Sequence, residues 1–103
     1  MSSISQCIYD IQRYHELREK IEAIISKLNS ASEYVGKVDF EIKTSYKVDG
    51  NSATISNQTT DLKNRIEDTS NYLSETVLPS IGYSLEDTRD TLRYLRRKAE
   101  EDD

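Results

Sequence analysis

The chain has little of what small proteins use for catalysis. It holds one cysteine, one histidine and no tryptophan in 103 residues. The lone Cys7 excludes an internal disulfide, and His15 does not share a helix face with it. No Glu-x-x-His, no Cys-x-x-Cys and no phosphate-binding glycine loop occurs. We therefore expect no enzymatic activity, no metal site and no cofactor.

Long apolar runs are also missing. Only 35% of the residues are hydrophobic, and no run is long enough for a transmembrane helix. The N-terminus lacks the basic and apolar regions of a cleavable signal peptide, so we expect a cytoplasmic protein that is exported, if at all, without one. The formal net charge of −5 argues against nucleic acid as the main ligand.

Glycine and proline are scarce, with three and one residues, and this makes one turn signal stand out. The segment Val48-Asp49-Gly50-Asn51-Ser52 lies near the middle of the chain and combines residues that tolerate left-handed backbone angles and cap helices. No comparable break interrupts residues 3–47. The sequence therefore predicts two long segments joined by this turn.

The first segment carries a heptad pattern, with alternating steps of three and four. Its apolar positions are Tyr14, Leu17, Ile21, Ile24, Leu28, Ala31, Val35, Val38 and Ile42. Ser3 and Gln6 have the spacing of a capping box, which places the helix start there. A competing pattern is the strict alternation from Val38 to Val48, which favours a β-strand; because its return arm is weak, helix is the preferred interpretation.

The second segment shows a thinner stripe. It consists of Ile55, Thr59, Leu62, Ile66, Thr69 and Leu73, and it continues through Val77, Ile81, Leu85, Thr88, Leu92 and Leu95. The steps of four around Val77 shift the stripe around the helix. Pro79 lies within this shift, so we expect a kink there; the alternative is a separate helix from Ser84.

Together these patterns predict an all-α, single-domain antiparallel hairpin over residues 1–103. The expected bounds are about 3–47 and 53–99 for the helices, 48–52 for the turn and 100–103 for a frayed acidic tail. Two helices with so few apolar residues leave their sides exposed to solvent, so we expect the hairpin to pair into a dimer or four-helix bundle.

Two helices joined at mid-chain in about a hundred residues resemble the WXG-type (ESX) small proteins of bacterial type VII secretion. The chain looks more like the Trp-less relatives of this family, which are encoded beside LXG toxins, than like its Trp-bearing members. Val48, Asp49 and Gly50 stand where the family carries Trp-x-Gly, and residues 77–81 resemble its late second helix. Tyr83 and Asp87 match the Tyr-x-x-x-Asp/Glu export signal of the family.

The resemblance implies a secretion partner, a targeting factor or a small substrate, bound to an LXG-type toxin or a related helical protein. The thin stripe through Thr59, Ile66, Thr69 and Leu73 is the predicted partner interface, where a more apolar helix would lie in a groove. The same features also suit a phage or other assembly protein that builds a helical bundle.

Overall fold

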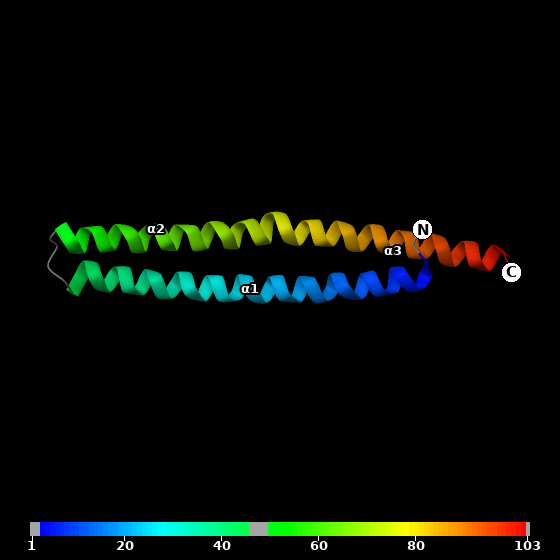
Figure 1. Ribbon diagram of the computed structural model, residues 1–103, viewed down its shortest axis with the longest axis horizontal. Coiled ribbons are helices and arrows are strands. Elements are labelled where there is room, and N and C mark those ends of the chain that lie inside the picture. The colour runs from blue at the N-terminus through cyan, green and yellow to red at the C-terminus, as the bar shows by residue number, and fades with distance from the viewer. Residues whose placement is uncertain (1–2, 46–49, 103) are drawn as a thin grey trace.

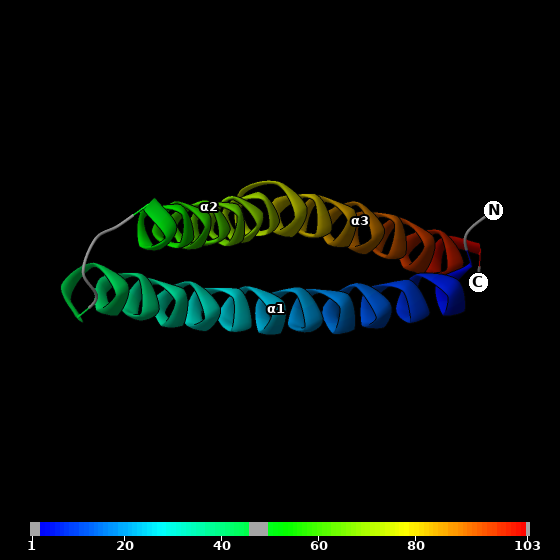
Figure 2. The same cartoon turned by 60° about the vertical axis from the view of Figure 1, so that its left-hand side comes forward.

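The computed structural model describes residues 3–45 and 50–102. Helix α1 spans Ile4–Ser45, α2 spans Gly50–Tyr72, a π-helical segment η1 spans Leu73–Val77, and α3 spans Leu78–Asp102. Helices α2 and α3 and the segment η1 form one continuous rod that runs antiparallel to α1 (Figures 1 and 2). The molecule measures 80 × 15 × 15 Å, and the predicted all-α hairpin is confirmed.

The ends of the helices differ in detail from the expected ones. Ser3 begins α1 as predicted, because its Oγ accepts a hydrogen bond from the Gln6 amide at 3.0 Å. Helix α2 begins at Gly50, three residues earlier than expected, and α3 continues to Asp102 where a frayed tail was expected from residue 100. The strand interpretation is wrong for residues 38–45, which are helical; residues 46–49, with Tyr46, Val48 and Asp49, lie outside the described residues.

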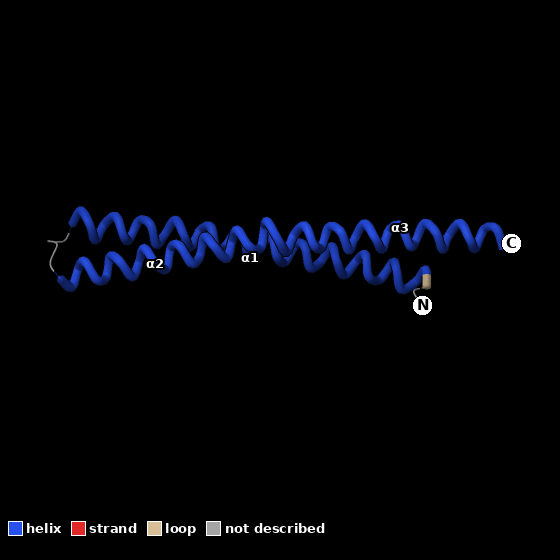
Figure 3. Tube along the Cα trace, turned by 90° about the horizontal axis from the view of Figure 1, so that it is seen from above, coloured by secondary structure: helices blue, strands red, loops and turns tan. Residues whose placement is uncertain are grey.

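The two rods wrap about each other. Seen from above, their traces cross near the middle of the molecule (Figure 3). Such a crossing is expected when seam residues repeat in steps of three and four, since that spacing falls slightly short of a whole number of α-helical turns.

Every second residue of the observed α1 seam lies one position later in the chain than predicted. We letter the seam positions a and d. All seam residues of α1 are buried or half-buried. Position d holds Cys7, Tyr14, Ile21, Leu28, Val35 and Ile42, and position a holds Ile4, Ile11, Arg18, Ile25, Ser32 and Asp39. The d positions from Tyr14 onward were predicted. The predicted partners Leu17 and Ile24 are instead each 44% exposed, in the g position immediately before each a residue.

The same displacement occurs on α2. Thr59, Ile66 and Leu73 lie at d as predicted, but the a positions are Ser56, Lys63 and Ser70. Ile55 and Leu62, which the stripe placed in the seam, are each 49% exposed. Beyond η1 the predicted residues Ile81, Leu85 and Leu92 do form the buried core.

Segment η1 takes the place of the predicted kink at Pro79. The Leu78 amide donates to the carbonyl of Leu73, five residues back, and Pro79 follows at once. Because proline has no amide hydrogen and its ring crowds the carbonyl four residues earlier, a wider turn accommodates it. The extra residue makes the spacing from Leu73 to Ile81 eight instead of seven, and no separate helix begins at Ser84.

Candidate partner-binding face

Polar residues hold the seam together near the turn. Asp39 of α1 accepts hydrogen bonds from the hydroxyls of Ser56 and Thr59 on α2, each at 2.8 Å. Its other carboxylate oxygen lies 2.8 Å from the Lys43 ammonium. Lys43 first, then Thr59 and Ser56, hold the pKa of the Asp39 carboxyl at about 2, below its ordinary 3.8. Asp39 thus joins the two helices as an ionised group.

Two further hydrogen bonds cross the seam toward the middle of the hairpin. Ser70 donates to the side-chain oxygen of Asn29 at 2.8 Å, and Ser32 donates to Glu67 at 3.1 Å. Ser32 and Ser70 are themselves buried. We call α2 and residues 17–45 of α1 the turn half. At most of its a positions, where a typical coiled coil buries aliphatic side chains, the turn half has polar residues, several of which make hydrogen bonds between the helices.

The apolar residues displaced from this seam form two rows at g positions. On α1 the row is Leu17, Ile24, Ala31 and Val38, and on α2 it is Ile55, Leu62 and Thr69. Each residue precedes an a position, and the helices run antiparallel, so equivalent positions lie on the same side of the pair. The two rows therefore share one surface, which we call the outer apolar face.

A shallow groove continues this face where the π-helical segment lies. Its volume is about 300 Å³. The groove is lined by Tyr14 and Leu17 of α1 and by Tyr72, Thr76, Val77, Ser80, Ile81 and Ser84 of the other rod. Leu17 belongs to both features, so the outer apolar face leads directly into the groove.

Polar side chains predominate on the opposite side of the hairpin. Arg18 and Arg89 approach the two ring nitrogens of His15, Arg18 at 2.9 Å and Arg89 at 3.1 Å. A neutral imidazole accepts at one nitrogen only, so the tautomer decides which contact is a hydrogen bond. Farther along this side, Gly36 lets the Lys63 side chain pack against α1, where an added Cβ would meet Lys63 Cε at 3.3 Å. Two exposed apolar residues, Ile8 at 47% and Phe40 at 68%, also lie on this side, but only the g rows form a continuous apolar surface.

The predicted interface residues are divided between the seam and the outer face. The Thr59 hydroxyl is occupied by Asp39 within the hairpin, and Ile66 and Leu73 are half-buried d residues. Thr69 is exposed, and its hydroxyl donates to the Arg65 carbonyl. Sequence reasoning missed the g rows as a surface. The available signal was the heptad spacing of polar residues: Ser32 and Asp39 are seven residues apart, and Ser56 and Ser70 are fourteen residues apart.

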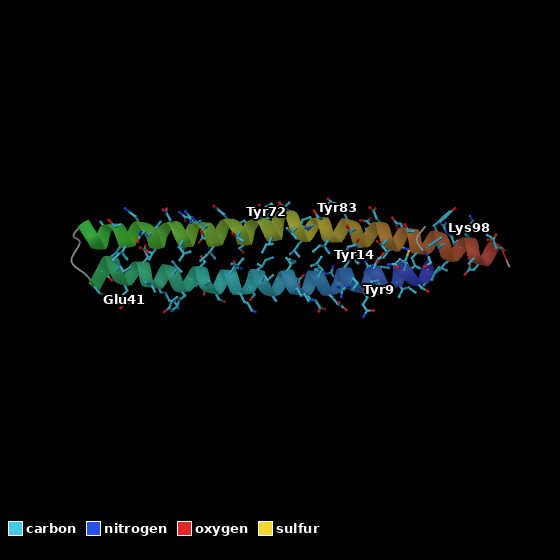
Figure 4. All side chains as sticks on the ribbon, in the orientation of Figure 1. Tyr9, Tyr14, Glu41, Tyr72, Tyr83 and Lys98 are labelled. Carbon is cyan, nitrogen blue, oxygen red and sulfur yellow. The ribbon has the colours of Figure 1, made fainter. Side chains whose placement is uncertain are left out.

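The candidate export signal lies apart from the outer apolar face. Tyr83 is 70% exposed and Asp87 is also exposed, and their four-residue spacing puts them on one side of α3. Tyr83 lies on the side of its rod away from α1, whereas Tyr14 lies between the rods (Figure 4). Of the predicted turn motif Val48, Asp49 and Gly50, only Gly50 is described, as the first residue of α2.

The described part of the chain offers little besides surfaces for binding. Among residues 3–45 and 50–102, no group of three or more His, Cys, Asp or Glu side chains is placed to hold a metal ion. No described helix is long and apolar enough to cross a membrane. Comparisons with protein-family models, curated proteins and solved structures find no match. The outer apolar face is therefore the feature from which a function can be inferred.

Proposed function

We propose that the protein is a non-enzymatic helical binding partner that takes up a helix of another protein on its outer apolar face. The observation that supports this proposal is that, in the turn half, polar residues occupy seam positions while large apolar residues are exposed. Polar residues such as Ser32 and Ser70 occupy the seam, while Leu17, Ile24 and Leu62 lie partly in water. A chain that only had to stabilise its own hairpin would place these residues the other way round.

The energetics require a long partner. Covering the exposed halves of Leu17, Ile24, Ile55 and Leu62 contributes roughly 1 kcal/mol for each side chain. Association costs at least about 4 kcal/mol in lost translational and rotational freedom. A stable complex must therefore also cover the smaller g residues and the groove beside η1, which a helix running the length of the face would do.

The resemblance to the Trp-less relatives of type VII secretion supplies the biological role in this proposal. The partner would be an LXG-type toxin or a related helical protein encoded by an adjacent gene, and the hairpin would act as its secretion partner or targeting factor. The competing role is an assembly protein in which copies of this chain cover each other's faces.

Solution mass of the protein alone and mixed with the adjacent gene product tests the binding. Ile24→Asp should abolish the complex, because it places a charge in the centre of the face. Ala23→Asp introduces the same charge on the neighbouring, exposed residue outside the face and should leave the complex intact. Equal behaviour of the two variants, with both hairpins remaining helical, would contradict the proposal.

Export is tested separately. Tyr83→Ala or Asp87→Ala should reduce appearance of the complex in the culture supernatant without weakening it in solution, because both side chains lie outside the outer apolar face. If deleting the gene leaves the stability and secretion of the neighbouring toxin unchanged, the assembly role becomes the better interpretation.

A further inference from the structure

The hydrogen bonds across the seam show which residues of the outer apolar face lie level with one another. Ser32 donates to Glu67, so their near neighbours Ala31 of α1 and Thr69 of α2 lie at about the same level. The bond between Ser70 and α1 gives the same register. Ala31 and Thr69 are the smallest members of the two g rows. We call their level the midpoint of the face.

The g residues of α1 are arranged symmetrically about this midpoint. Ile24 and Val38 lie seven residues before and after Ala31. A two-fold axis through the midpoint, perpendicular to the length of the hairpin, sets a second copy face to face with the first, with each helix antiparallel to its own counterpart. That axis places Ala31 against Ala31, and Ile24 against Val38 of the second copy. Small residues at the axis let the helices approach closely, while larger residues beside them interdigitate.

The outer edge of α1 is complementary to itself in the same register. The edge residues lie three positions after the g residues and are their neighbours on the helix surface: Lys20, Lys27, Tyr34 and Glu41. The axis places Lys20 opposite Glu41 of the second copy, and Lys27 opposite Tyr34. All four side chains are exposed, and none belongs to the four ion pairs between described residues. They are therefore available for contacts with another chain.

The outer edge of α2 matches as well. The axis places Arg65 of each copy opposite Tyr72 of the other, where a guanidinium group can stack on a ring that is 60% exposed. Asp61 and Asp68 flank Arg65 at helical neighbour spacing, so this edge carries no excess of positive charge that would repel a second copy. One axis thus suits both edges, although they lie on different helices whose relative register is fixed by the seam.

Going beyond the proposed function, we infer that a second copy of this chain covers the outer apolar face until the binding partner arrives. The two hairpins lie face to face and antiparallel, with the two-fold axis at Ala31 and Thr69. Such a pair is closed and cannot extend into an assembly. Uptake of the partner then requires the pair to dissociate, so self-association shields the face from unrelated helices. This displacement rests on the proposed function, whereas the pairing itself does not.

The pair is expected to be weak. It covers side chains that are already half-buried, and exposed ion pairs at its edges contribute little. We expect a dissociation constant of roughly 10–100 µM. The hairpin is then a monomer at the low micromolar concentrations at which unfolding is measured.

Sedimentation equilibrium from about 5 µM to about 500 µM tests the pairing across the range in which the pair should form. Glu41→Lys should weaken it at least about fivefold, because it sets Lys20 against a lysine at two symmetric places. Combining it with Lys20→Glu exchanges the two charges and should restore the dissociation constant to within about twofold of the unmodified chain. The control is Glu33→Lys, which makes the same change of charge at an exposed position outside the face and its edges. It should have no effect.

Rescue by the exchange is specific to the antiparallel register. In a parallel pair α1 would lie opposite α2, so Lys20 and Glu41 would not meet. Failure of the exchanged variant to recover, with its helicity intact by circular dichroism, would overturn the register.

Cross-linking places the axis directly. Oxidised Ala31→Cys should form a disulfide-linked dimer, because the two copies of this residue meet at the axis. Leu17→Cys lies on the same face, but its two copies would be roughly 42 Å apart at 1.5 Å per residue and should not be linked. The native Cys7 is 1% exposed and does not interfere. Equal cross-linking at the two positions would reflect random collision and overturn the axis.

Mixing with the adjacent gene product separates this inference from the proposed function. We expect the mass of a complex that contains one copy of this chain. A chain that stays monomeric at about 500 µM, but still binds the gene product in a manner sensitive to Ile24→Asp, would overturn the resting pair and leave the proposed function standing. A pair that persists intact in the complex would overturn the displacement and show that the gene product binds elsewhere.

Discussion

The two halves of the hairpin differ in what they bury at the a positions of the seam. In the terminal half, which comprises α3 and residues 4–16 of α1, the seam residues of α1 are apolar, and those of α3 are Ile81, Leu85, Leu92 and Leu95 with Thr88 as the polar member. Cys7 and Leu85 are almost fully buried. In the turn half, the a positions other than Ile25 are Arg18, Ser32, Asp39, Ser56, Lys63 and Ser70. The comparison shows that the terminal half buries its large aliphatic residues in its own core, whereas the turn half leaves Leu17, Ile24, Ile55 and Leu62 about half exposed.

The π-helical segment η1 lies at the boundary between the turn half, with its polar a positions, and the terminal half, with its apolar core. Before η1, d residues alternate with polar a residues; after it, Ile81, Leu85 and Leu92 are all buried. The extra residue in η1 rotates α3 relative to α2, which turns an apolar row of the second rod into the seam. The groove lined by Tyr72 and Val77 lies at this change of phase.

The largest effect on stability is expected in the terminal half. Leu85→Ala should lower the free energy of unfolding by about 3 kcal/mol, because it removes a side chain that is 2% exposed and leaves a cavity. Leu28→Ala, at a half-buried d position of the turn half, should cost about half as much. Urea unfolding measures both, and equal losses would mean that the two halves do not differ in this way.

The second prediction concerns pH. The folded-state pKa of Asp39 is about 2, below its ordinary 3.8, so folding favours the ionised carboxylate. The stability it provides is fully present above pH 3.8 and is lost as the pH falls toward 2. The midpoint of thermal unfolding should therefore fall over this range, and should fall less in Asp39→Asn.

Other carboxylates titrate in the same range, so the informative quantity is the difference between the two proteins. Glu41→Gln, at an exposed position on the same helix, serves as the control and should follow the unmodified chain. Parallel pH profiles for Asp39→Asn and the unmodified chain would show that the contacts with Ser56 and Thr59 contribute nothing near the turn.

The fold was predictable because its signals are local. Steps of three and four, the Ser3 cap and the turn segment around Gly50 are each read from neighbouring residues. The terminal-half core was also predicted, since Ile81, Leu85 and Leu92 are the most apolar choice on their helix. The run of fours around Pro79 indicated that the stripe shifts there, but it predicted a kink and not the π-helical segment.

The seam of the turn half was mispredicted for a physical reason. Counting apolar residues favours Leu17 and Ile24 over Arg18, because a single helix gives no information about what a polar side chain will meet. Asp39 and Ser70 are stable in the seam only through partners on the other helix, such as Ser56 and Asn29. Those pairings follow from the register of the hairpin, which one sequence does not determine.

A smaller effect is expected for the hydrogen bond between Ser70 and Asn29. Ser70→Ala and Asn29→Ala should each cost about 1 kcal/mol, and the double variant should cost about the same as either, because both remove one interaction. Asn64→Ala, at an exposed position of α2, is the control. Additive losses would show that the two side chains do not depend on each other.

The smallest effect on the isolated chain is expected on the outer apolar face. Leu62→Gln should change the free energy of unfolding by about 1 kcal/mol or less, because the side chain is 49% exposed and glutamine is a good helix former. Leu92→Gln makes the same substitution in the terminal half at a position 8% exposed. It should destabilise the chain by a few kcal/mol because it buries an amide without a partner.

In a binding assay we expect the opposite ranking, with a larger effect for a substitution at Leu62 than for one at Leu92. Leu62→Gln should weaken binding of the proposed partner severalfold, since the methyl groups it removes lie on the outer apolar face. A milder variant, Leu92→Val, should leave uptake unchanged at temperatures where it is folded, because Leu92 lies inside the hairpin. If Leu62→Gln instead unfolded the chain while binding survived in the folded fraction, the g rows would serve the hairpin itself, and the distinction between the two halves would fail.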